Sequence, residues 1–85
     1  MGRYTVLLTD QARKDTAKLT PKLRKKLHEV LEEVLSAEPT RGKRLMGDLK
    51  GLRSYHLTYK DRIVYRIDES AKRVIVYRTR THYGD

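Results

Sequence analysis

Residues 62–80 read RIVYRIDESAKRVIVYRTR, two apolar and β-branched runs separated by a short polar segment. In the first run Ile63, Tyr65 and Ile67 alternate with mostly basic residues, a period of two that is typical of a strand with one buried face. Residues 54–58, SYHLT, form a similar run one short turn earlier. Three successive strands joined by short turns predict an antiparallel meander.

The N-terminal half predicts a strand followed by two helices. Residues 4–8, YTVLL, are β-branched and apolar, and Thr9 or Asp10 can cap a short helix after them. A second helix is expected from Pro21, with Thr20 as its N-cap, and its apolar residues recur at helical spacing up to Leu35. After it comes a basic, glycine-containing loop, with an irregular strand expected around residues 45–49.

The order of elements is therefore β-α-α-β-β-β, an α+β fold in a single domain of residues 1–85. We expect a curved antiparallel sheet with the two N-terminal helices on one face, which leaves the other face free for binding.

The amino-acid composition excludes several classes of protein. The chain has 85 residues, no cysteine and a net charge of +9, with most of the excess after residue 42. Disulfide scaffolds and cysteine-based zinc sites are excluded, and no apolar run approaches the roughly 18 residues of a membrane span. We expect a soluble cytoplasmic protein without a metal or other cofactor, and an anionic partner such as nucleic acid or an acidic protein.

One pair of residues suggests chemistry. His82 and Tyr83 follow the basic end of the last strand, which contains Arg78 and Arg80. An imidazole can transfer protons near neutral pH, and arginine binds phosphate, so a phosphodiester site is one reading. The other is a terminal pair without a role. His28 is expected on a helix surface and His56 as packing in the sheet.

Family resemblance favours the first reading. Residues 45–54, LMGDLKGLRS, resemble a Leu-x-x-x-Leu-x-Gly-x-Trp-Ser element, and RIVY at 62–65 follows Gly51 at the matching distance. The ending RTHY, residues 80–83, resembles Arg-Tyr-His-Tyr. These motifs resemble the RelE/ParE superfamily of bacterial type II toxins, most closely its YoeB/Txe branch of mRNA interferases.

The resemblance implies a ribosome-dependent endoribonuclease that cuts mRNA in the A site without a metal. The ribose 2′-hydroxyl would attack its own phosphate, leaving a 2′,3′-cyclic phosphate and a 5′-hydroxyl. By position, Arg62 would hold the scissile phosphate, His82 would protonate the leaving oxygen and Tyr83 would orient the substrate. The implied partners are the ribosome and a cognate antitoxin with an acidic or amphipathic segment, through which operator DNA would be bound.

The chain also departs from the family pattern. Lys43 stands near the position of a glutamate that is the proposed base in YoeB-like toxins, Arg53 replaces the tryptophan, and Tyr55 and His56 replace an arginine pair. Lys43 could act electrostatically or as a base, or activation could depend on His82 and the ribosome. His56 could be a second functional imidazole.

The remaining basic candidates are expected to bind RNA or the ribosome. They are Lys22, Lys25, Lys26, Arg41, Arg44, Arg53, His56, Arg78 and Arg80. Two alternatives remain open: a ParE-like toxin that inhibits DNA gyrase without cutting RNA, and an RNA-binding module without catalysis.

Overall fold

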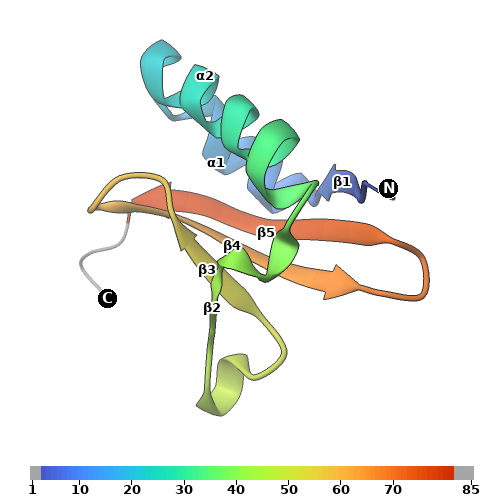
Figure 1. Cartoon of the computed structure of the whole chain (residues 1–85). Coiled ribbons are helices and arrows are strands. Elements are labelled where there is room, and N and C mark those ends of the chain that lie inside the picture. Colours follow the sequence, from blue (N-terminus) through green and yellow to red (C-terminus); the bar gives the residue numbers. More distant parts are fainter. Residues whose placement is uncertain (1–2, 82–85) are drawn as a thin grey trace.

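The structure, a computed structural model, describes residues 3–81, with side chains described for residues 3–79. Two helices lie together on one side of a five-stranded sheet (Figure 1), as the sequence predicts for an α+β fold. The elements are β1 (Thr5–Leu8), α1 (Asp10–Ala17), α2 (Pro21–Val30), β2 (Lys43–Arg44), β3 (Arg53–His56), β4 (Asp61–Asp68) and β5 (Arg73–Thr81).

The strands lie in the order β1-β5-β4-β3-β2. The antiparallel meander from β3 to β5 is confirmed, but the sheet is mixed rather than wholly antiparallel because β1 pairs in parallel with β5. The two helices that follow β1 carry the chain across one face of the sheet. The next strand, β2, therefore joins at the opposite edge, beside β3.

The segment around residues 45–49 differs from the prediction. The strand that pairs with β3 is only Lys43–Arg44, and Gly47–Leu49 form a 3-10 turn at the tip of the hairpin. Gly47 and Gly51 flank this tip with φ angles of 66° and 99°, which residues with a Cβ adopt at a cost. A continuous strand therefore cannot run through this segment.

Both helices begin where the sequence predicts. The Thr9 hydroxyl accepts a hydrogen bond from the Ala12 N–H, and the Thr20 hydroxyl accepts one from the Leu23 N–H, so each side chain caps its helix. The second helix is regular only to Val30 and continues as a π-helical turn over Leu31–Leu35. Leu31 and Leu35 stay buried in that turn, so the apolar face extends as far as predicted.

The core lies between the helices and the sheet. Its buried apolar residues are Ala12, Leu27, Leu31, Leu35, Leu57, Ile63, Tyr65, Val74 and Val76. A β-bulge disturbs the ladder between β4 and β5, where Val64 lies opposite Arg78 but Tyr65 lies opposite Val76. Because Tyr77 is the extra residue, the alternation of β5 shifts and Thr79 becomes buried.

No helix within residues 3–81 combines the length and the apolar character needed to cross a lipid bilayer.

Candidate functional site

The register of the sheet brings several predicted residues to one face. Ile63 and Tyr65 of β4 point into the core, so Arg62 and Val64 belong to the opposite face, the second face of the sheet. His56 lies directly opposite Arg62, Ser54 lies opposite Val64, and Lys43 lies opposite Ser54. Because opposite residues in a ladder share a face, Lys43, Ser54, His56 and Arg62 are grouped on the second face.

A pocket of about 480 Å³ opens at this group. We call it the cationic pocket. Its polar lining residues are Arg41, Lys43, Ser54, Tyr55, His56 and Arg62, and Leu45 adds an apolar wall. Two buried polar atoms, the Oγ of Ser54 and the Nε of Arg62, have no hydrogen-bond partner among the described residues. Unsatisfied buried polar groups are uncommon and require an explanation, and a bound ligand that accepts hydrogen bonds supplies one.

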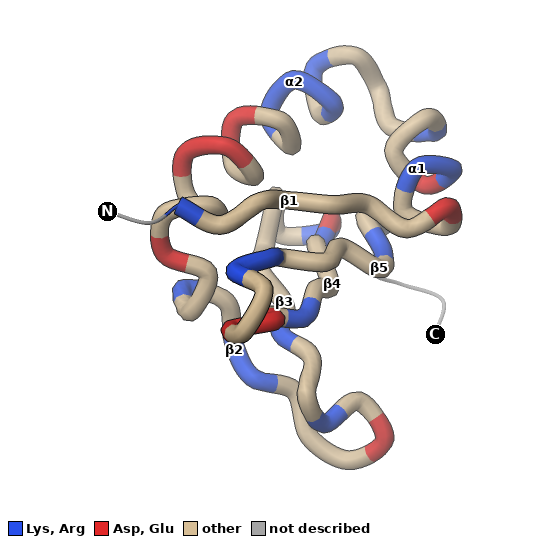
Figure 2. The backbone as a smooth tube through the Cα atoms, turned by 90° about the vertical axis from the view of Figure 1, so that its right-hand side faces the viewer, with Lys and Arg blue, Asp and Glu red and all other residues tan. Residues whose placement is uncertain are grey.

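The charge of the pocket has a single sign. Its described lining contains Arg41, Lys43 and Arg62 and no carboxylate. Arg41 forms an exposed ion pair with Glu38 at 3.1 Å, whereas no ion pair is found for Lys43 or Arg62 among the side chains of residues 3–79. Figure 2 shows Lys and Arg along the β2 region and at several places in the sheet, whereas the acidic residues of the second helix follow its basic first turns. The pocket is thus suited to an anion.

Tyr65 fixes the backbone that carries two of these cations. Its buried hydroxyl accepts the Gly42 N–H at 2.9 Å and donates to the Pro39 carbonyl at 2.5 Å. A Cβ at Gly42 would overlap the Tyr65 ring, so the residue between Arg41 and Lys43 has to be glycine for this close approach. Burial raises the pKa of Tyr65, which keeps the hydroxyl protonated and able to donate.

Other predicted RNA-binding residues lie elsewhere. Arg44 and Arg53 line a second hollow near Ile67, and the Arg53 guanidinium donates to the Gly42 carbonyl at 2.9 Å. Lys22, Lys25 and Lys26 line a third hollow on α2, together with Glu29 and Thr58. These residues are basic and exposed or half-buried, but the structure does not bring them into the cationic pocket.

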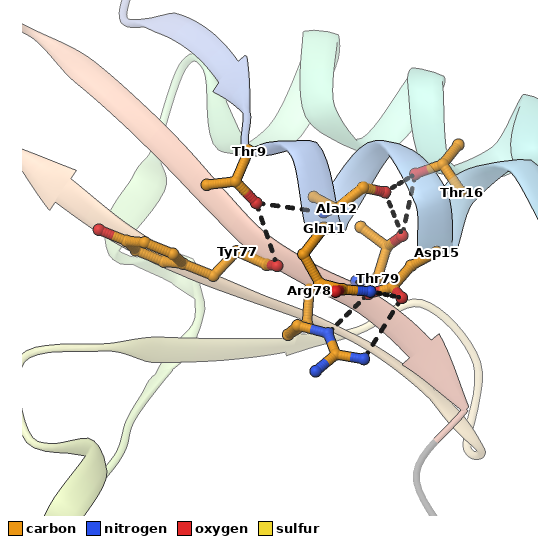
Figure 3. A network of polar contacts seen from close by, with 8 residues as sticks. All are labelled: Thr9, Gln11, Ala12, Asp15, Thr16, Tyr77, Arg78 and Thr79. Atoms are coloured by element: carbon orange, nitrogen blue, oxygen red, sulfur yellow. Dashed lines mark hydrogen bonds and ion pairs between the residues drawn. The ribbon is translucent and has the colours of Figure 1, made fainter.

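Arg78 is held by a buried carboxylate. Its Nε donates to Asp15 at 2.7 Å, and the same carboxylate accepts from the Thr79 N–H and from Gln11 (Figure 3). Burial alone would raise the pKa of Asp15, but the hydrogen bonds from Arg78, Gln11 and Thr79 together lower it. This network fastens the end of β5 to α1 beyond the point where β1 stops.

The structure describes only some of the candidate residues at the C-terminal end. Arg80 lies opposite Arg62 in the ladder, and β5 continues to Thr81. His82 and Tyr83, predicted as the acid and the substrate-orienting residue, lie outside the described residues. No group of three or more His, Asp or Glu side chains in residues 3–81 could hold a metal ion.

The sequence does not single out Ser54 as a functional residue, because no base or acid stands beside it in the chain. Its position was nevertheless readable, since Ser54 and His56 are two residues apart on a strand and so share a face. What could not be read is that this face meets Arg62 and Lys43, because that depends on the register of three strands.

Comparison with known proteins decides the family. Residues 6–83 match the model of the ParE-like toxin of type II bacterial toxin–antitoxin systems. The chain belongs to this family. A chain in the toxin–antitoxin complex RelBE2 from Mycobacterium tuberculosis is similar over 96% of this chain and 94% of its own length, with 36% identity and a TM-score of 0.89.

More distant structures share the toxin fold. The YoeB/ParE toxin from Agrobacterium tumefaciens is 24% identical, over 93% of this chain and 99% of its own, with a TM-score of 0.80. The isolated RelE toxin of E. coli is 23% identical, over 96% and 87%, with a TM-score of 0.78. No curated protein shows significant sequence similarity to the chain. The chain is therefore a type II toxin with a RelE-like fold, and YoeB-like toxins are among its structural neighbours.

Proposed function

We propose that this toxin is a ribosome-dependent mRNA endoribonuclease that cuts mRNA in the A site and so inhibits translation. The observation that supports this most is the cationic pocket on the second face of the sheet. It groups Lys43 and Arg62 with no carboxylate among its described lining residues, and it leaves the Arg62 Nε and the Ser54 Oγ without partners within the described part of the chain. A phosphodiester would satisfy both the charge and the hydrogen-bonding groups.

In this proposal the residues have distinct roles. Arg62 holds the scissile phosphate and stabilises the charge that develops on it when the ribose 2′-hydroxyl attacks. Lys43 adds positive charge at the same phosphate. His82 protonates the leaving 5′-oxygen and Tyr83 orients the substrate, on the basis of the family resemblance alone. The reaction yields a 2′,3′-cyclic phosphate and a 5′-hydroxyl, and it uses no cofactor.

The remaining basic surface would bind the ribosome. Lys22, Lys25 and Lys26 on α2, with Arg41, Arg44 and Arg53 near β2, present positive charge on separate surfaces. Contacts of this kind release counterions from RNA, so binding should weaken as salt rises. Arg80 is a further candidate, whereas Arg78 would first have to leave Asp15.

We further propose that the toxin acts as a single cytoplasmic domain and is silenced by a cognate antitoxin. Its net charge of +9 suits an acidic or amphipathic segment of that antitoxin. The RelBE2 relative is itself described as a toxin–antitoxin complex. Operator DNA would be bound through the antitoxin.

Inhibition of DNA gyrase is the alternative, because the matching family model is described as ParE-like and the sequence resemblance leaves a gyrase-inhibiting ParE-like toxin open. A cell-free translation reaction, followed by primer extension on the mRNA, separates the two activities, with a gyrase supercoiling assay run in parallel. We expect cuts that require ribosomes and that Arg62→Ala removes, whereas Arg13→Ala, an exposed arginine on α1, leaves them unchanged. Translation arrest without cuts would support a non-catalytic RNA-binding module, and loss of supercoiling would support gyrase inhibition.

A further inference from the structure

Among its described lining residues, the cationic pocket contains one side chain of a type suited to accept a proton at neutral pH. Lysine and arginine side chains are ordinarily protonated near pH 7, and serine and tyrosine hydroxyls are ordinarily too weakly acidic to act as bases there. An imidazole exchanges protons in this range. Among the described lining residues, His56 is the only imidazole.

His56 is placed where a base is needed. It is the last residue of β3 and lies directly opposite Arg62 on β4, so their Cβ atoms are expected about 4.5–5.5 Å apart on the same face. Arg62 is the residue proposed to hold the scissile phosphate. The ribose 2′-oxygen is attached to the carbon next to the one whose oxygen carries that phosphate, so it would lie within reach of the neighbouring strand.

The ring nitrogens of His56 have no polar partner in the described part of the chain. His56 is exposed, and its imidazole forms no hydrogen bond or ion pair with another residue in the range 3–79, although its backbone belongs to the β3–β4 ladder. A histidine that serves only as sheet packing is expected to be buried or hydrogen-bonded. The groups facing it across the pocket are Lys43 from β2, Arg62 from β4 and Arg41 from the turn before β2, and all three are basic side chains.

We propose that His56 is the general base of the cleavage reaction, an inference that rests on the proposed endoribonuclease function. The imidazole takes the proton of the ribose 2′-hydroxyl as the O2′–phosphorus bond forms. The phosphorus–O5′ bond breaks, and its electron pair leaves on O5′, which receives a proton from the general acid, proposed to be His82. Lys43, at the place of the family's glutamate, then serves as a positive charge rather than as the base.

The test uses the full chain and ribosomes that carry an mRNA with one defined codon in the A site. Single-turnover cleavage is measured at saturating toxin, so that the rate reports chemistry and not binding. We expect His56→Ala to slow cleavage by about 10²–10⁴-fold, the usual contribution of a general base. His28→Ala, an exposed histidine on α2, should stay within about twofold of the wild type, since it lies away from the pocket.

A second substrate separates the base from the acid. Sulfur in place of the bridging 5′-oxygen is a good leaving group that needs no proton, so it rescues loss of an acid but not loss of a base. His82→Ala should therefore recover on the sulfur-containing mRNA, whereas His56→Ala should remain slow. Thermal melts of each variant check that the fold is intact, and His56→Gln replaces His56→Ala if the latter is unstable.

The outcomes are distinguishable. If the wild type does not cleave, the proposed function fails. If it cleaves and His56→Ala keeps its rate at saturation, His56 at most binds RNA and the base assignment is overturned. If His56→Ala is rescued by the sulfur substrate, His56 is the acid and the assignment is equally overturned. Slow cleavage on both substrates supports the proposal.

Discussion

Asp15 is expected to be one of the most sensitive polar positions for stability, although it lies on a helix far in sequence from its partners. Asp15→Ala removes the acceptor of the Thr79 N–H, whose residue is 1% exposed, and the partner of Arg78. Leaving that N–H buried and unpaired costs about 1–3 kcal/mol. The Arg78 side chain is 38% exposed and can regain water, so loss of its ion pair adds at most about 1 kcal/mol.

These contributions sum to about 1–4 kcal/mol of lost unfolding free energy. For a domain of this size the melting temperature should fall by roughly 4–30 °C, measured by circular dichroism or calorimetry. Asp48→Ala is the matched control, because Asp48 is exposed in the turn at the tip of the β2–β3 hairpin. If Asp15→Ala melts within about 2 °C of Asp48→Ala, the network does not stabilise the fold as reasoned.

The same carboxylate gives a pH signature. The pKa of Asp15 is lowered in the folded state from a reference value of 3.8, so the unfolded chain binds this proton more readily. The stabilisation is therefore complete above that reference value and is lost as the pH falls through the lower, folded-state pKa. The stability gap between the wild type and Asp15→Ala should be constant near neutral pH and should narrow below about pH 4 in denaturant titrations. A gap that widens on acidification would contradict the sign.

Two further substitutions test the packing. Leu31→Ala should lower the unfolding free energy by about 2–5 kcal/mol, because Leu31 is 4% exposed in the core, and a loss below about 0.5 kcal/mol in urea would refute its place there. Tyr65→Phe should lower the unfolding free energy by about 1–3 kcal/mol, because the Gly42 N–H and the Pro39 carbonyl lose their shared hydroxyl. An unchanged urea midpoint for Tyr65→Phe would show that these groups find other partners.

The local parts of the fold were readable from sequence because short-range physics determines them. Thr20 before Pro21 marks a helix start, and the alternation of Ile63, Tyr65 and Ile67 marks a buried strand face. The parallel pairing of β1 with β5 was not readable. The direction of this pairing depends on the path of the chain through the two helices. The apolar pattern of residues 5–8 is the same for a parallel and an antiparallel strand.

The candidate site, too, has one part that the local sequence predicts and another that depends on the tertiary structure. Arg62 could be named from its motif, but its neighbours His56 and Lys43 come from other strands and depend on register. The partner of Arg78 was hidden for another reason. The bulge at Tyr77 shifts the alternation of β5, and Asp15, in a charged helix, carries no sign in the sequence that it will be buried.

The central claim is that the cationic pocket around Arg62 serves cleavage of mRNA in the ribosomal A site. The most direct test maps the ends of mRNA recovered from ribosomes arrested by the purified toxin, at nucleotide resolution. We expect cuts within the A-site codon that carry a 2′,3′-cyclic phosphate and a 5′-hydroxyl, and that disappear with Arg62→Ala but persist with Arg13→Ala. Intact mRNA on arrested ribosomes, or cut ends that carry a 5′-phosphate, would contradict it.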